Sequence, residues 1–105
     1  MTHPKGATPF KTTVAGDSSG GLTIKAAVTG KSLYITKLVI SASDAGNYQV
    51  EDEDNTAALE QLYMPANSVF SATFDDAIEL ATGKALQMTG SVAGTATVTA
   101  VGYSL

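Results

Sequence analysis

The hydrophobic and polar residues of this chain alternate in short runs, as they do in β-strands with one buried face. In residues 22–29, LTIKAAVT, alternate positions beginning at Leu22 are apolar. In residues 96–103, alternate positions beginning at Ala96 are small or apolar and those between them are mostly Thr, Val and Tyr. A side-chain period of two predicts a strand in each stretch.

Residues 32–43, SLYITKLVISAS, carry apolar side chains on both faces and are rich in β-branched residues. This pattern is typical of a central strand or of a strand that carries a bulge near Thr36–Lys37. A short strand follows at residues 48–52, with Tyr48 and Val50 facing inward.

Residues 57–64, AALEQLYM, fit a short helix as well as a strand. We predict a strand, because Pro65 would end a helix after about two turns. Further strands are predicted at residues 69–74 and 85–90, separated from their neighbours by Gly, Asn, Asp and Ser clusters.

About seven or eight short strands with frequent turn signals predict an all-β fold, an antiparallel β-sandwich of jelly-roll-like form. No long amphipathic helix is predicted. The predicted domain spans residues 22–105, and 105 residues suffice for one compact core.

Residues 1–21 mix Pro, Gly, Ser and Thr with few large apolar side chains, so we predict an extended N-terminal arm outside the domain. Phe10, Lys11 and Val14 are its candidate partner-binding residues. An arm of this kind can add a strand to the exposed sheet edge of a neighbour.

Charge is distributed unevenly along the chain. Residues 1–43 hold five lysines and one acid, whereas residues 44–105 hold one lysine and nine acids. There is no arginine, which argues against nucleic acid as a partner. There is also no cysteine, no apolar run long enough to span a membrane and no secretory leader. Synthesis in the cytoplasm, without membrane insertion, is the expectation.

The stretch EDEDN at residues 51–55 is the strongest candidate for a metal site. Neither possible calcium-loop register supplies the glycine and the final glutamate that such a loop needs. We therefore interpret it as the solvent-exposed end of a hairpin. Only weak metal candidates remain, namely Asp52 and Asp54 together with Asp75 and Asp76 from another loop, and no cofactor is expected.

No catalytic arrangement is predicted. His3 is the only histidine and lies in the predicted arm, where it cannot orient a serine nucleophile. The pair Asp75–Asp76 lacks the apolar and aromatic surroundings that separate the pKa values of catalytic carboxylates. The glycines do not have phosphate-loop spacing, and the aromatic residues, including Tyr34 and Tyr63, recur at strand spacing as core residues do. An enzyme with a small-molecule substrate is therefore not expected.

Two stretches, residues 30–43 beginning with GKSLY and residues 62–103 beginning with LYMPANS, resemble the small β-sandwich virion proteins of tailed bacteriophages. The resemblance covers residues 30–103 and rests on strand and turn patterns. It implies a virion location and a role as a capsid decoration or cement protein. The implied partners are the major capsid protein or other virion proteins, and the implied form is a homo-oligomer, a dimer or trimer.

Two alternatives remain open from the sequence. One is a cation-dependent binding module for carbohydrate or a host surface, which would use residues 51–55 and the pair Asp75–Asp76. The other is a structural component of a head fibre or tail.

Overall fold

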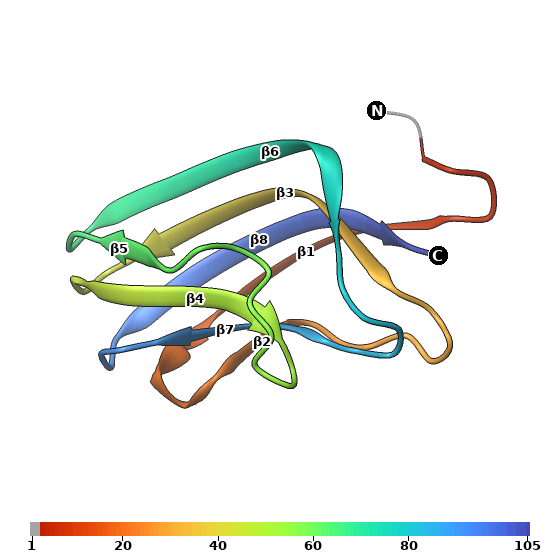
Figure 1. Ribbon diagram of the computed structural model, residues 1–105. Coiled ribbons are helices and arrows are strands. Elements are labelled where there is room, and N and C mark those ends of the chain that lie inside the picture. Colours follow the sequence, from red (N-terminus) through yellow and green to blue (C-terminus); the bar gives the residue numbers. More distant parts are fainter. Residues whose placement is uncertain (1–2) are drawn as a thin grey trace.

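The computed structural model describes residues 3–105, which form eight β-strands and one short 3-10 turn (Figure 1). Among these residues no helix is long and apolar enough to cross a bilayer. The elements are β1 (Thr8–Asp17), η1 (Ser18–Gly20), β2 (Leu22–Lys25), β3 (Leu33–Ala42), β4 (Gly46–Asp52), β5 (Leu62–Met64), β6 (Ser68–Glu79), β7 (Leu86–Gly90) and β8 (Thr95–Ser104).

The strands form two four-stranded antiparallel sheets packed face to face, as Figure 1 shows. Sheet A has the order β1-β8-β3-β6, and sheet B has the order β2-β7-β4-β5. Every connection except that between β4 and β5 crosses from one sheet to the other, which is the jelly-roll-like order. The all-β antiparallel sandwich predicted from the sequence is confirmed.

The core lies between the sheets and is built by the alternate residues of each strand. The fully buried side chains include Leu38 and Ile40 of β3, Leu86 and Met88 of β7, and Val98 of β8. Each large aliphatic side chain buried in this way contributes about 1.5–3 kcal/mol. The inward faces predicted for residues 96–102 and for β4 are confirmed.

Both features that the pattern of residues 32–43 indicated are present, since β3 is a central strand of sheet A and carries a bulge at Thr36. Thr36 is an extra residue in β3, because Ile35 pairs with Gly102 of β8 while Lys37 pairs with Val101. The buried Thr36 hydroxyl donates to the Val101 carbonyl over 3.0 Å, so the bulge leaves this side chain with a partner inside the sheet. β6 bulges at the same level, where residues 74–77 lie opposite Thr36 alone.

Two predicted strands are shorter in the structure. Within residues 57–64 only β5 is a strand, and Ala57 makes an isolated bridge to Glu51, so this segment is not a helix. The strand predicted at residues 22–29 ends at Lys25. The reason is that Lys25 pairs with Leu86, the first residue of β7, so the chain beyond Lys25 has no partner strand.

The predicted arm at residues 1–21 is corrected by the structure. Residues 8–17 form β1, which pairs with β8 over all ten residues and belongs to sheet A. The segment has too few apolar residues to order alone, but the edge of β8 supplies hydrogen-bond partners and the core supplies apolar contacts. Residues 1 and 2 of the predicted arm lie outside the described residues.

Candidate functional site

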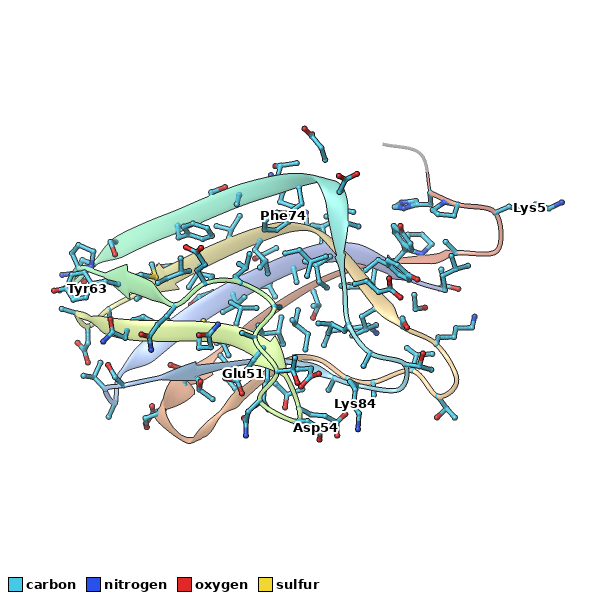
Figure 2. The ribbon with its side chains drawn as sticks, in the orientation of Figure 1. Lys5, Glu51, Asp54, Tyr63, Phe74 and Lys84 are labelled. Atoms are coloured by element: carbon cyan, nitrogen blue, oxygen red, sulfur yellow. The ribbon has the colours of Figure 1, made fainter. Side chains whose placement is uncertain are left out.

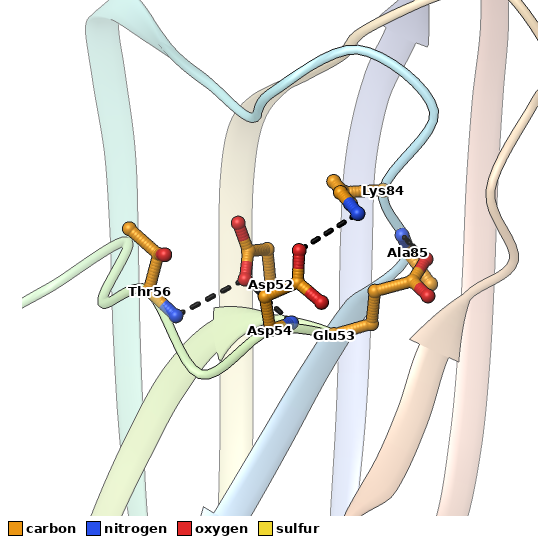
Figure 3. A network of polar contacts seen from close by, with 6 residues as sticks. All are labelled: Asp52, Glu53, Asp54, Thr56, Lys84 and Ala85. Carbon is orange, nitrogen blue, oxygen red and sulfur yellow. Dashed lines mark hydrogen bonds and ion pairs between the residues drawn. The ribbon is translucent and has the colours of Figure 1, made fainter.

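The acidic stretch forms a tight turn at the end of β4, shown in Figure 3. The Asp52 N–H donates to the Thr56 carbonyl over 2.9 Å, and the Asn55 N–H donates to the Asp52 carbonyl over 3.0 Å. One carboxylate oxygen of Asp52 accepts from the N–H groups of Asp54 and Thr56, at 2.8 and 3.0 Å. Asn55 has φ 65°, a conformation that Asn tolerates better than most residues. Asp52 therefore organises the turn through both its backbone groups and its carboxylate.

The expectation of a fully solvated hairpin end is wrong for the first two acids. Glu51 and Asp52 are each only 4% exposed. One Glu51 carboxylate oxygen accepts from the Gln87 amide over 2.8 Å, and the other accepts from the Thr89 hydroxyl over 3.0 Å. These partners lie on β7, beside β4 in sheet B, so pairing of the two strands supplies donors that the local sequence does not contain.

The other two acids are exposed and bind the segment that precedes β7. Asp54 forms an ion pair with Lys84 at 2.7 Å, and a Glu53 carboxylate oxygen accepts from the Ala85 N–H over 2.8 Å (Figure 3). The hydrogen bond and the charge of Asp54 raise the pKa of Lys84 above its usual value. All four acids of the stretch thus have partners within the chain.

The structure does not gather the candidate metal ligands into one site. Asp52 and Asp54 lie at the end of β4 in sheet B, whereas Asp75 and Asp76 are exposed in the bulge of β6 in sheet A. Within residues 3–105 no three His, Asp or Glu side chains lie close enough together to hold a metal ion. The geometry of residues 51–55 is that of a structural turn.

Replacing Asp52 by Ala should lower the free energy of unfolding by about 1–3 kcal/mol, because two backbone N–H groups lose their acceptor. Thermal or urea unfolding should show the same loss in calcium and in chelator. The control is Asp75→Ala, which removes an exposed carboxylate and should change stability by less than about 0.5 kcal/mol. A calcium-dependent rise in the melting temperature of the wild type that Asp52→Ala abolishes would instead establish a cation site.

The three predicted partner-binding residues lie on different faces of β1. Phe10 and Val14 point inward and pack, half-buried, against the core, and the Lys25 ammonium lies 5.3 Å from the centre of the Phe10 ring. Lys11 is exposed on the outer side. Since alternate residues of a strand face opposite ways, these three residues cannot form a single outward-facing patch in β1.

The outer face of sheet A is a broad surface of small and β-branched side chains. Register across the four strands places three rows on it: Pro9, Tyr103, Tyr34 and Glu79; Lys11, Val101, Lys37 and Thr73; Thr13, Thr99, Val39 and Ser71. Val69 of β6 belongs to the same face and is 67% exposed. By contrast, the outer face of sheet B carries amide and acidic side chains that bond to one another, such as Gln87 with Glu51.

Aromatic side chains occupy one end of this outer face. The rings of Tyr34 and Tyr103 stack with centres 4.9 Å apart, and His3 packs edge-on against Tyr103 at 5.4 Å. The Tyr34 hydroxyl donates to Glu79 over 3.2 Å, and burial, followed by that carboxylate, raises the pKa of Tyr34. Assigning Tyr34 to the core was wrong, as it was for Tyr63, which is 69% exposed (Figure 2).

The sequence contains the signal for this surface, since the alternation that marks inward residues also marks outward ones. The lysines of the first half of the chain contribute Lys11 and Lys37 to the outer face of sheet A, while the acids of the stretch 51–55 lie at one end of sheet B. The uneven charge along the chain does not become a division between the sheets, because Asp75, Asp76 and Glu79 of β6 also belong to sheet A.

Comparison with solved structures finds a likeness of this whole fold in a chain of the cyanophage Pam1 capsid. In the structure described as "Cyanophage Pam1 capsid asymmetric unit", the similar chain superposes with a TM-score of 0.54 and 13% sequence identity. The match covers 98% of this chain and 89% of that chain. No family model and no curated protein matches the sequence.

At 13% identity the likeness shows a shared fold. Because the match covers 98% of this chain, the unmatched residues are far fewer than the ten of β1. The likeness therefore includes most or all of β1. The coverage of 89% on the other side means that the two chains have similar lengths.

Proposed function

We propose that this protein is a non-enzymatic structural protein of a bacteriophage particle, and that it acts as a decoration or cement protein. In this role it binds capsid subunits from outside and stabilises the head. The observation that carries the proposal is the likeness over nearly the full length of both chains to a member of a capsid asymmetric unit. The fold alone does not assign a function, so the surface must supply the rest of the argument.

The side-chain chemistry of the sandwich supports a role in contact. The acids that first suggested a metal or acid–base site bind backbone N–H groups, amides and a lysine of the same chain. Carboxylates used in this way hold a turn and join neighbouring strands.

We assign the contact with capsid subunits to the outer face of sheet A. This face combines exposed aliphatic groups with hydroxyl groups, and it carries Lys37 on the central strand β3. A protein interface is typically mixed in this way, with charges that steer and orient the partner. The matching surface on the capsid is expected to be acidic near Lys37.

Substituting Lys37→Glu should weaken binding to undecorated capsids by about tenfold or more, because the reversed charge then faces acidic groups. Binding can be measured by co-sedimentation of the purified protein with particles. The matched control is Lys5→Glu, an identical change of charge on an exposed lysine away from the outer face of sheet A (Figure 2). Equal binding by both variants would remove the outer face of sheet A as the contact.

Copy number in purified particles tests the role itself. A decoration protein should be present in hundreds of copies by quantitative mass spectrometry, because it follows the symmetry of the shell. A dozen copies or fewer would indicate a vertex, head-fibre or tail component. Absence from the particle would contradict the proposal.

A further inference from the structure

The sandwich has four edge strands, and they differ sharply in how they are protected. In sheet B, β2 and β5 have only four and three residues. In sheet A, β6 is long but is interrupted by its bulge, where Asp75 and Asp76 are exposed. Short length, bulges and charges are the usual devices that prevent a strand edge from pairing with another chain.

β1 has few of these devices, namely Lys11 and, near its start, Pro9, which has no N–H. It is ten residues long, its ladder with β8 has no register shift, and Lys11 and the terminal Asp17 are its only charged residues. Within residues 3–105 its backbone hydrogen bonds go to β8, and no others are formed along its second side. A long, regular edge with a free row of N–H and C=O groups is a template for another strand.

We propose that β1 pairs in antiparallel fashion with β1 of a second copy of this chain, across a twofold axis through Thr13. The two copies of sheet A then form one continuous eight-stranded sheet. The inference rests on the geometry of β1 alone and does not depend on the proposed role in a phage particle.

Charge and strand length together favour this register. Residues directly opposite each other lie on the same face in every register of this kind, and in this one Thr13, which faces outward, meets its own copy at the axis while residues 9–17 of both copies pair. Lys11 lies opposite Ala15 of the second copy and diagonal to Asp17 of that copy, an attractive arrangement. Centring the pair on Thr12 would place Lys11 diagonal to Lys11 of the second copy, which is repulsive. Centring it on Val14 would place Lys11 directly opposite Asp17 but would leave only residues 11–17 paired.

The inner face of β1 is complementary to itself in the same register. Phe10 lies opposite Gly16 of the second copy, and Thr12 lies opposite Val14. Phe10 and Val14 are half-buried at the edge of the isolated sandwich, so a neighbouring strand would cover the apolar surface that remains.

A twofold pairing also explains why the assembly stops at two copies. The interface is isologous, so each copy uses its β1 edge once. The opposite edge of sheet A is β6, whose bulge and two aspartates oppose further pairing. The result is a closed dimer with no growing end.

Sedimentation velocity across about 1–100 µM tests the proposal, with a dimer expected in the micromolar range. Ala15 is exposed, so it can be changed with little effect on the monomer. Ala15→Lys creates two like-charge pairs across the interface, each between position 15 of one copy and Lys11 of the other. It should weaken the dimer about tenfold or more, whereas Ala15→Glu should strengthen it. The double variant Lys11→Glu with Ala15→Lys should restore the dimer.

Ser71→Lys is the matched control, because it adds the same charge to an exposed position on β6, the far edge of sheet A. It should leave the association unchanged, and the melting temperature should confirm that every variant folds. A wild type that stays monomeric at about 100 µM would overturn the proposal. A trimer would also overturn it. Equal effects of Ala15→Lys and Ala15→Glu on dimer association would do so as well. A dimer that Ala15→Lys does not weaken would indicate exchange of β1 between copies and would equally overturn it.

Discussion

Deletion of residues 1–21 should lower the free energy of unfolding by more than about 4 kcal/mol and leave a chain that does not fold cooperatively. The deletion removes β1, exposes the edge of β8 over ten residues and uncovers the inner face that Phe10 and Val14 now protect. Circular dichroism and chemical unfolding of the truncated protein measure the effect. Aggregation is an expected accompaniment, because β8 is long, apolar and unprotected as an edge.

A shorter deletion, of residues 1–7, is the control. It removes the segment before β1, which within the described residues has a turn at Pro4–Ala7 and the packing of His3 on Tyr103. This protein should fold with a melting temperature close to that of the full chain. If the 1–21 deletion instead unfolds at the same temperature as the full chain, β1 is dispensable and the domain begins at residue 22, as the sequence suggested.

Substituting Gly102→Ala should destabilise the fold by more than about 3 kcal/mol. A Cβ atom at this buried position would overlap the Tyr34 carbonyl oxygen and lie 3.1 Å from the Phe10 ring. The close approach arises at the bulge of β3, where one extra residue brings the backbone of β3 toward β8. Because the nearest atom is a backbone oxygen, side-chain movement cannot relieve the overlap. The backbone in the centre of sheet A would have to move.

Gly20→Ala provides the comparison for this prediction. Position 20 lies in η1, and a Cβ atom there would meet no heavy atom within 4 Å. It should change the free energy of unfolding, measured by urea denaturation, by no more than about 0.5 kcal/mol. Equal stability of the two variants would mean that the Tyr34 carbonyl does not lie over Gly102 in solution.

The strengths and errors of the sequence analysis have physical causes. Val50 and Val98 were placed in the core by alternation, and apolar side chains on both faces of residues 32–43 indicated a central strand or a bulge, because both patterns are local properties of one strand. The acids at 51 and 52 were placed in solvent because their partners, such as Thr89, lie on another strand. Sequence patterns predict that an acidic residue is exposed whenever its hydrogen-bond donors lie far away along the chain.

The candidate surfaces show the same division. The turn chemistry of Asn55 and Asp52 is local and was recognised as a hairpin end, although not as a closed network. The outer face of sheet A was missed, because its rows combine residues from four strands whose neighbours are set by the order of the sheet. The free edge of β1 was likewise beyond reach while residues 8–17 were assigned to an arm.

The amino-acid sequence by itself determined that this protein is an antiparallel sandwich and which residues of most strands face inward, since both follow from the period of the side chains along each strand. Only the tertiary structure decided that residues 8–17 are part of the sandwich, that the acids of the stretch 51–55 are paired within the chain, and that β1 is the long unprotected edge. Each of these depends on contacts between segments far apart in sequence, whose free energy no local pattern records.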